Sequence, residues 1–330
     1  MSSVDKVIAK SNSLGRPVAL ICGVSGQDGG YLAELLLKKG YTVFGTSRDA
    51  QGSSFSNLEK LGIKDQIHYL SMSPEDFRSI LAALRKSNPD EIYYLAGQSS
   101  VGLSFEQPAE TIQSIALGTL NILEGCRMMD KSIKIYNAGS SECFGDTRGQ
   151  PANEATPFYP MSPYAVAKSS AYWLVNNYRQ AYDLFACTGI LFNHESALRP
   201  ERFVTQKIIR AVKRIADGSN ERLTLGRLDI ARDWGWAPEY VEAMWLILQQ
   251  EKPQDFVIAT GVTITLEEFV KTAFEQAGLN WKDHVIQDPM LFRPSDLAIG
   301  RADPSRANQT LGWRASTQGI AVVQKMYQAI

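Results

Sequence analysis

The sequence predicts a doubly wound α/β fold, in which helices cover both faces of a parallel sheet, with a smaller lobe at the C-terminal end. Three observations lead to this prediction. Short apolar runs alternate with helical apolar spacing over roughly the first 195 residues, which is typical of parallel strands with crossover helices. The first run ends in a glycine-rich turn, and the alternation stops from Arg199 onward. We therefore expect a loose leader over residues 1–15, a sheet domain over 16–195, and a lobe over 196–330 that is partly interleaved with the sheet domain.

Composition and charge exclude several classes of protein. The chain has 330 residues, 44% hydrophobic and 21% charged, which is ordinary for a globular protein long enough for two domains. A net charge of −1 gives no electrostatic reason to expect nucleic acid or a membrane surface as a partner. The polar N-terminus and the lack of any apolar run near about 18 residues argue against export and membrane spanning. The four cysteines lack the close pairing of a zinc site, so we expect no metal and reduced thiols in the cytoplasm.

The first glycine-rich turn has the context of a dinucleotide site. An apolar run over residues 17–22 precedes the turn, and helical spacing follows it over residues 31–39. A strand, a glycine turn and a helix in this order bring backbone N–H groups and a helix N-terminus to a pyrophosphate. We prefer this interpretation to a plain tight turn. The expected cofactor contacts are Gly23, Ser25, Gly26, Gln27, Asp28 and Gly29.

The next strand, expected over residues 41–46, leads to Arg48 and Asp49. An acid at this point would bind the ribose 2′-hydroxyl of NAD, whereas an arginine can hold the 2′-phosphate of NADP. Because Arg48 comes first, the sequence favours NADP. NAD stays open, because Asp49 would repel the phosphate.

Small and acidic side chains follow two later strands. Strands are expected over residues 67–70, 91–96 and 133–138, with helices over 74–86 and 111–129. Ligands of such sheets gather at the carboxyl ends of the strands. We expect Ser140 and Glu142, at one such end, to lie beside the helix that begins near Tyr164. The strand over residues 91–96 ends in a second group of candidates. These residues either border the ribose and nicotinamide or merely form a turn: Leu95, Gly97, Gln98, Ser99 and Ser100.

Tyr164 and Lys168 are the strongest pair of candidate catalytic residues. They lie four residues apart on one face of a helix expected over residues 164–182, after a proline-rich loop over 149–163. A nearby ammonium lowers a phenol pKa that is normally about 10, which makes Tyr164 a usable acid or base. About one such pair arises by chance in a chain of this size, so the spacing alone is a weak signal. Of the 13 tyrosines, however, only Tyr164 has a lysine at this spacing.

Basic side chains gather after the last expected strand of the sheet domain. That strand covers residues 185–192 and ends at Asn193-His194-Glu195-Ser196. Arginines and lysines beyond it could clamp phosphates, an arginine by a bidentate fork. Most isolated arginines are merely solvated, so this alternative stays open for each. The residues concerned are Arg199, Arg202, Lys207, Arg232 and Arg293.

With these motifs in hand, the chain resembles an extended short-chain dehydrogenase/reductase with a Rossmann-like domain, and more narrowly the GDP-mannose 4,6-dehydratase family. The resemblance runs over about residues 18–313. Besides the glycine turn, the stretches that carry it are Tyr159-Pro160-Met161-Ser162-Pro163-Tyr164-Ala165-Val166-Ala167-Lys168, Leu191-Phe192-Asn193-His194-Glu195-Ser196, Arg232-Asp233-Trp234-Gly235, Asp255-Phe256-Val257-Ile258-Ala259-Thr260-Gly261 and Phe292-Arg293-Pro294.

The resemblance implies a hydro-lyase that carries out an internal redox elimination on a GDP-sugar, with tightly bound NADP. Tyr164 would remove the proton of the hexose 4-hydroxyl while C4 gives a hydride to the cofactor. Lys168 would hold the ribose and lower the pKa of Tyr164, and Ser140 would hydrogen-bond the 4-oxygen. Glu142 would abstract the C5 proton as water leaves from C6, before the hydride returns to C6. The implied product is GDP-4-keto-6-deoxymannose, a precursor of surface-polysaccharide sugars.

The resemblance also implies binding residues, and some positions depart from the family pattern. Asp49 stands where a second arginine and a longer loop are common, which leaves both the NADP preference and a homotetramer open. Met161 and Trp236 also replace common residues, so GDP-manno-heptose stays open as the substrate. We expect a homodimer formed through the helices over 111–129 and 164–182. The implied cofactor contacts are His194 and Arg199, and the implied substrate contacts are Ser100, Asn193, Thr205, Lys207, Arg232 and Arg293.

Two alternatives keep the fold and change the activity. A GDP-4-keto-6-deoxy-sugar reductase would consume NADPH and would not need Glu142. A non-catalytic NAD(P)-binding sensor would have no need of Ser140, Glu142, Tyr164 and Lys168 together, and fold alone does not decide between these functions.

Overall fold

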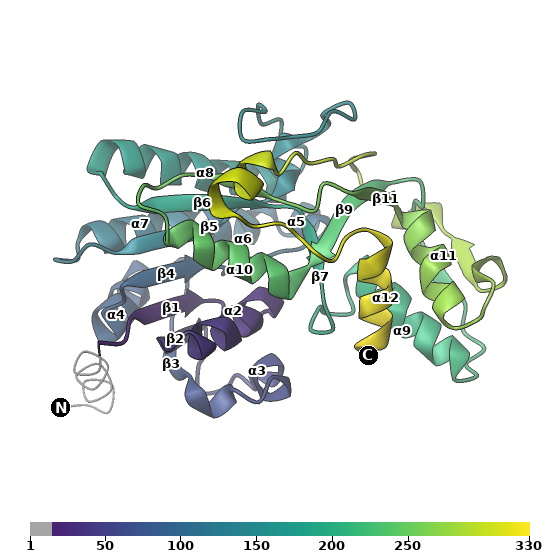
Figure 1. Ribbon diagram of the computed structural model, residues 1–330, viewed down its shortest axis with the longest axis horizontal. Coiled ribbons are helices and arrows are strands. Elements are labelled where there is room, and N and C mark those ends of the chain that lie inside the picture. Colours follow the sequence, from purple (N-terminus) through teal and green to yellow (C-terminus); the bar gives the residue numbers. More distant parts are fainter. Residues whose placement is uncertain (1–14) are drawn as a thin grey trace. The chain divides into compact units, whose positions relative to one another are not determined.

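The computed structural model describes residues 15–330, so almost all of the expected leader over residues 1–15 lies outside the described part of the chain. The largest sheet has seven strands, and all of the pairings among the strands β1 to β6 are parallel. The doubly wound parallel sheet is thereby confirmed. Figure 1 labels these six strands. In spatial order the strands are β10 (Phe256–Ile258), β6 (Ala186–Leu191), β5 (Lys134–Ala138), β4 (Glu91–Tyr94), β1 (Val18–Cys22), β2 (Thr42–Ser47) and β3 (His68–Ser71).

Helices cover both faces of this sheet because its strands are apolar on both sides, as buried parallel strands are. On one face α4 (Phe77–Ser87), α7 (Gly118–Arg127) and α8 (Pro163–Tyr182) enclose a core that includes Leu20 and Phe44. On the other, α2 (Gln27–Lys38) and α10 (Ala237–Leu248) lie in front of the strands in Figure 1. The Nε1 of Trp245 on α10 donates to Tyr41 Oη at 3.1 Å, which ties this helix to the start of β2.

Several helices differ from the sequence-based expectations. Helix α2 begins at Gln27 rather than near residue 31. Its first turn packs closely against the glycine turn, where a Cβ at Gly29 would lie 2.7 Å from Val24 Cα. The long helix expected over 111–129 begins earlier, at α6 (Pro108–Ile112), and passes through a π turn, η2 (Gln113–Leu117), into α7. Two short helices were not expected, α3 (Ser56–Lys60) and α5 (Val101–Glu106).

The chain folds into two compact units. Unit 1 contains residues 15–143, 162–190 and 241–256, and unit 2 contains residues 144–161, 191–240 and 257–330. The proline-rich loop belongs to unit 2 because Glu154 accepts the N–H of Val257 at 2.8 Å and Ala152 pairs with Ala302. The functional division into a cofactor domain and a substrate lobe stays a prediction.

Unit 2 is built around a small mixed sheet in the order β11 (Thr263–Thr265), β9 (Ala231–Trp236), β7 (Asn193–Glu195), with a separate pair β8 (Leu223–Leu225) and β12 (Val285–Gln287). Helices α9 (Val204–Ala216), α11 (Leu266–Gln276) and α12 (Ile320–Gln328) contribute to its core, where Trp234 packs edge-on against Phe269. The remaining helical turns of the described chain are η1 (Lys64–Gln66), η3 (Ser141–Phe144), η4 (Trp281–Asp283), η5 (Pro289–Leu291) and η6 (Ala307–Leu311).

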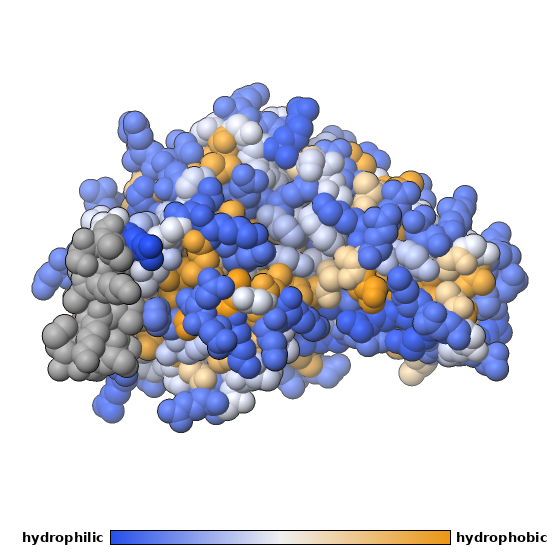
Figure 2. All heavy atoms as spheres, turned by 60° about the horizontal axis from the view of Figure 1, so that its bottom comes forward, coloured by the Kyte–Doolittle hydropathy of each residue, from blue (hydrophilic) through white to orange (hydrophobic). Residues whose placement is uncertain are grey.

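Hydrophilic side chains cover most of the face seen in Figure 2, with apolar residues between them in small groups. Over residues 15–330, no helix has both the length and the apolar character needed to cross a membrane.

A buried ion pair fastens α8 to the strands beside it. Arg179 donates to both carboxylate oxygens of Asp255, at 3.0 and 2.6 Å, and Asp255 also accepts the N–H of Thr188 at 2.7 Å. Asp255→Asn leaves the guanidinium uncompensated, so we expect unfolding free energy to fall by about 3 to 5 kcal/mol. Urea denaturation measures the loss.

The matched control is Asp229→Asn, because Arg227 also donates to both carboxylate oxygens of Asp229, through Nε and Nη2 at 2.9 and 2.7 Å, on the surface. An exposed pair of this kind contributes less than about 1 kcal/mol. Equal losses in the two variants would contradict the role given to the buried pair.

Candidate active site

A short turn at the carboxyl end of β5 presents Ser140 and Glu142. The Oγ of Ser140 accepts the backbone N–H of Glu142 at 3.3 Å, so the Ser140 side chain is tied to the backbone of Glu142. Ser140 is buried and Glu142 is half-buried. Glycine is needed at position 139, because a Cβ there would lie 2.7 Å from Thr188 Cγ2 on the neighbouring strand. Both side chains are therefore held at the end of the strand, as the sequence predicts.

Helix α8 brings Tyr164 and Lys168 to the same strand end. It begins at Pro163, and the hydroxyl of Ser162 caps it by accepting the N–H of Ala165 at 3.1 Å. Lys168 Nζ donates to Ala138 O at 2.7 Å and lies 5.8 Å from the centre of the Tyr164 ring. Ala138 is the last residue of β5, two positions before Ser140. Unit 1 therefore gathers all four predicted catalytic residues around one strand end.

Burial and nearby acidic groups have opposite effects on the pKa of Lys168. Burial lowers the pKa of Lys168 from 10.5 to about 8, while Cys143 and the charge of Asp28 act in the opposite direction. Lys168 is thus mostly an ammonium at neutral pH. One of its N–H groups is committed to Ala138 O, and an ammonium has three.

The glycine turn after β1 has the shape of a pyrophosphate cradle. Gly23 has a φ of +88°, and a Cβ there would lie 3.1 Å from Ala96 Cα. Gly26 begins α2 without a side-chain cap, so no side chain at this position competes for the N–H groups of the first turn. Ser25 is exposed beside it, and Gln27 and Asp28 lie in the first turn. The turn fits a dinucleotide because two of its residues, Gly23 and Gly26, carry no Cβ and the helix that follows starts without a side-chain cap.

The residues after β2 divide their roles. The side chain of Arg48 is 74% exposed and lies 3.6 Å from Glu110. The carboxylate of Asp49 turns into its own loop, where Oδ1 accepts the N–H groups of Gln51 and Gly52 at 2.9 Å each. Arg48 is therefore the more available of the two for a ligand.

The residues after β4 mainly fix their own loop. Leu95 continues the sheet by donating its N–H to Cys22 O at 3.0 Å, and Gly97 has a φ of +132°. The amide of Gln98 bonds the backbone N–H and C=O of Ser100, and the hydroxyl of Ser100 caps α5. Ser99 is exposed. Contacts of these residues with cofactor or substrate stay predictions.

In unit 2, the predicted ligand residues near β7 are tied to an acid that sequence analysis did not single out. Thr205 donates to Glu195 at 2.7 Å, and Arg199 forms an ion pair with the same carboxylate at 3.3 Å. Glu195 is buried beside Asn193 and His194 on β7. Since Thr205 is also buried, its hydroxyl supports the arrangement around Glu195, and direct contact with a substrate stays a prediction.

Another acid, Asp296, draws two predicted nucleotide-binding residues together. Its Oδ1 lies 2.9 Å from Arg232 Nη2 and 3.5 Å from Arg293 Nη1. Lys207, in contrast, donates to Thr224 O at 2.8 Å. The sequence contains one indication of this role for Asp296. It follows Arg293 by three residues, so its carboxylate can contact the guanidinium from the same loop.

Two solved structures of nucleotide-sugar enzymes share the fold of this chain. A UDP-glucose 4-epimerase from Thermotoga maritima superposes with a TM-score of 0.84 at 21% identity, covering 94% of this chain and 98% of that one. A dTDP-glucose 4,6-dehydratase from Streptomyces venezuelae, with NAD bound, gives 0.84 at 18% identity, covering 94% and 96%. The chain has the fold of the extended short-chain dehydrogenase/reductases.

Sequence comparison narrows the class. Residues 20–326 match the family described as GDP-mannose 4,6 dehydratase. GDP-mannose 4,6 dehydratase 1 of Arabidopsis thaliana is 47% identical over 323 residues, which cover 94% of this chain and 89% of that protein. The GDP-mannose 4,6-dehydratase of Sinorhizobium fredii is 44% identical over 328 residues, covering 92% and 93%. The chain belongs to the GDP-mannose 4,6-dehydratase family and is a hydro-lyase of nucleotide-sugar metabolism.

Proposed function

We propose that this protein converts GDP-mannose into GDP-4-keto-6-deoxymannose and water. The observation that carries the proposal is the bond from Lys168 Nζ to Ala138 O, because it holds the Tyr164 helix against the strand end that bears Ser140 and Glu142. A base for an O–H and a separate carboxylate for a C–H are what an oxidation followed by elimination requires. A reductase needs only the first.

NADP is the proposed cofactor. The turn at Gly23 and the uncapped start of α2 support a pyrophosphate there, and Lys168 would hold ribose hydroxyls with its remaining N–H groups. Arg48 supports the 2′-phosphate, since the Asp49 carboxylate is engaged by Gln51 and Gly52. When bound, the cofactor supplies the acceptor for a hydride from C4 and returns that hydride to C6.

Tyr164 and Ser140 would act at the 4-oxygen. Tyr164 Oη takes the proton of the 4-hydroxyl, and the Lys168 ammonium favours the phenolate that does so. Ser140 Oγ orients the same oxygen by a hydrogen bond. The 4-keto group that forms makes the neighbouring C5 proton acidic.

Glu142 would act at C5 and C6. Its carboxylate takes the C5 proton and passes it to the departing 6-hydroxyl, which leaves as water. C5 regains a proton once C6 has been reduced. C5 takes this proton from solvent, and Tyr164 releases to solvent the proton that it took from the 4-hydroxyl, so both side chains end each turnover in their starting state.

The GDP portion would be held by basic and polar side chains of unit 2. Arg232 and Arg293 already share Asp296, and phosphate oxygens would give their forks a second anionic partner. Lys207, Thr205 and Asn193 complete the proposed substrate contacts, and His194 and Arg199 the proposed cofactor contacts.

The substrate can be identified directly. The purified protein is incubated with GDP-mannose and, separately, with GDP-manno-heptose, each with catalytic NADP+ or NAD+. Mass spectrometry should find the loss of one water from GDP-mannose, faster with NADP+, without net reduction of the cofactor. Turnover of the heptose alone would replace the proposed substrate, and stoichiometric consumption of NADPH would indicate a reductase.

Cofactor affinity should depend on pH through Lys168. Because its pKa is about 8, the affinity of the cofactor-free protein for NADP+ should fall as the pH rises through about 8, where the ammonium is lost. Stability follows the opposite trend. Between about 8 and 10.5 the unfolded chain binds more protons than the folded one, so this group adds stability as pH rises.

Titration calorimetry across this pH range measures the affinity. In Lys168→Met the affinity for NADP+ should fall, and its dependence on pH should disappear. An unchanged alkaline decline in that variant would assign the titration to another group.

A homodimer in the cytoplasm completes the proposal. The four cysteines are free and buried, as in a reducing compartment. Helices α6 to α8 carry exposed apolar side chains that a second copy would cover, and analytical ultracentrifugation at micromolar concentration should therefore detect a dimer rather than a monomer or tetramer. These side chains are Ile112, Leu117, Val166 and Trp173, which are 44%, 38%, 43% and 59% exposed.

A further inference from the structure

Two contacts within unit 2 define the setting of His194. Its Nδ1 is 2.8 Å from Phe192 O, and because a carbonyl can only accept, Nδ1 carries the proton. The ring is stacked on that of Tyr240, with centroids 4.6 Å apart and planes 22° apart. Two independent contacts thus fix both the tautomer and the plane of the imidazole.

Gly235 makes room for the stack. In the parallel pair of β7 and β9, His194 is the partner of Gly235, so a side chain at position 235 would point to the same face as the imidazole. A Cβ there would lie 2.6 Å from Tyr240 Oη and 2.7 Å from its Cζ. The glycine of the Arg232-Asp233-Trp234-Gly235 stretch therefore provides the surface on which the Tyr240 ring lies.

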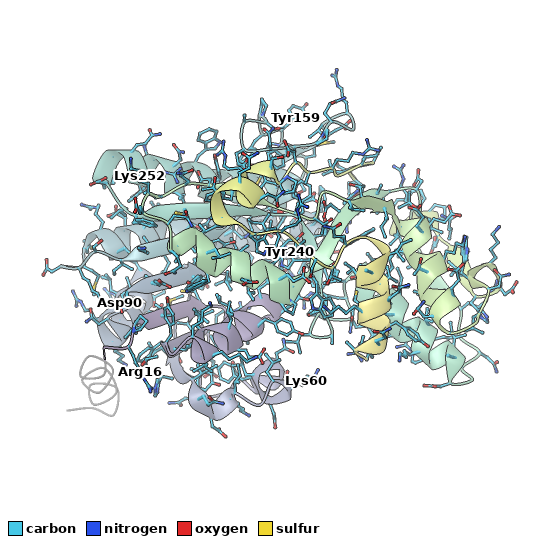
Figure 3. The ribbon with its side chains drawn as sticks, in the orientation of Figure 1. Arg16, Lys60, Asp90, Tyr159, Tyr240 and Lys252 are labelled. Atoms are coloured by element: carbon cyan, nitrogen blue, oxygen red, sulfur yellow. The ribbon has the colours of Figure 1, made fainter. Side chains whose placement is uncertain are left out.

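Tyr240 is itself held in place from the other side. It is completely buried in the first turns of α10 (labelled in Figure 3), and Trp313 meets it edge-on with centroids 5.7 Å apart. Trp313 is anchored in turn, since its Nε1 donates to Glu239 O at 2.9 Å. The position of the ring is thus determined by packing on two sides.

The hydroxyl of Tyr240 does not explain its presence. Its oxygen is buried and has no hydrogen-bond partner among the described residues. Burial and the charges of Asp233, Glu239 and Glu195 raise the pKa of Tyr240 well above its usual value, so the phenol stays neutral near pH 7. What remains is the flat face of the ring, which contacts His194.

We infer that Tyr240 is a positioning residue that holds the His194 imidazole in the orientation in which it contacts the cofactor, and that Gly235 provides the space for it. The inference rests on the proposed contact between His194 and NADP. It assigns a role to Tyr240 and Gly235, which have none in the proposed mechanism.

The test uses the whole chain of 330 residues with three substitutions, two at Tyr240 and one at His194. Tyr240→Leu removes the flat face, Tyr240→Phe keeps it, and His194→Ala removes the proposed contact. Dissociation constants for NADP+ are measured by titration calorimetry. Tyr240→Leu should weaken binding by about three- to tenfold, the range of one aromatic contact, while Tyr240→Phe stays within about twofold. Combined with His194→Ala, Tyr240→Leu should cause no further loss, because the two residues act through one contact.

A spectroscopic readout separates positioning from general destabilisation. The chain has three histidines, so selective histidine labelling gives three imidazole signals, each assigned by its own substitution. Ring protons above an aromatic face are shifted upfield, so the His194 signals should move downfield in Tyr240→Leu and stay in place in Tyr240→Phe. The signals of His68 and His284 should not move in either variant.

Each outcome decides the inference. If Tyr240→Leu is too unstable to study, adding Gly235→Ala to it fills part of the vacated space, and the paired variant should fold with the same loss of affinity. An unchanged affinity in the leucine variant, or losses that simply add in the double variant, would overturn the positioning role alone. No loss in His194→Ala would overturn the proposed cofactor contact together with the inference.

Discussion

Glu142→Gln is expected to abolish the loss of water while C4 oxidation and cofactor binding persist. Glutamine keeps the size of the side chain but cannot take a proton from C5 or give one to the 6-hydroxyl. General acid–base groups of this kind contribute on the order of a thousandfold to a rate, so product formation should fall by at least that factor. Reduced cofactor should then accumulate to about one equivalent per active site, because the 4-keto sugar cannot proceed.

Absorbance of the reduced nicotinamide and mass spectrometry of the sugar nucleotide measure the two steps separately. Asp146→Asn is the matched control, because this exposed acid follows on the same segment four residues later. It should leave both steps unchanged. A glutamine variant that still releases water at more than about a tenth of the normal rate would remove Glu142 from the mechanism.

Tyr164→Phe is expected to stop the reaction one step earlier. Without the phenolic oxygen nothing takes the proton of the 4-hydroxyl, so neither reduced cofactor nor product should form, and the rate should fall by about a thousandfold. Affinity for NADP+ should change little, because Lys168 keeps its bond to Ala138 O and its remaining donors. Stopped-flow absorbance and calorimetry report on the two quantities.

The control for this variant is Tyr182→Phe, at the far end of the same helix, where the residue is 49% exposed. Its rate should match that of the unaltered protein. If Tyr164→Phe instead reduced the cofactor at a normal rate, a different group would have to act as the base at the 4-hydroxyl.

Together these variants order the chemistry. A block before hydride transfer at Tyr164 and a block after it at Glu142 would separate oxidation from elimination. The reductase alternative predicts no role for Glu142, and the sensor alternative predicts no effect of either substitution on a rate.

The strands of the sheet could be predicted closely from the sequence because buried parallel strands are continuous apolar runs. The run over residues 17–22 corresponds to β1 (Val18–Cys22), and that over 185–192 to β6 (Ala186–Leu191). The rule that ligands gather at the carboxyl ends of such strands likewise anticipated that the helix of Lys168 would lie at the end of β5, where Lys168 Nζ donates to Ala138 O two residues before Ser140. Whether they act in catalysis stays a prediction.

The remaining features depend on contacts between distant segments, which no local pattern reveals. Helix α2 includes Gly29 in its first turn although glycine is a poor helix former, and this glycine packs against the backbone of Val24. Asp296 bonds Arg232, which is 64 residues away in the sequence. Glu195 contacts Thr205 and Arg199 only once β7 and α9 have folded. Glu195 and Asp296 occupy donor groups of the residues that were predicted to bind a ligand. These contacts therefore change how available those residues are to a ligand.

The central claim is an internal transfer of hydrogen within one sugar, and an isotope test addresses it most directly. GDP-mannose deuterated at C4 is incubated with the protein and a catalytic amount of NADP+, and the product is examined by mass spectrometry and NMR. We predict that the deuterium is retained and appears in the C6 methyl group of the 4-keto product. Loss of the label, or its recovery in the free cofactor pool, would contradict the proposed dehydratase mechanism.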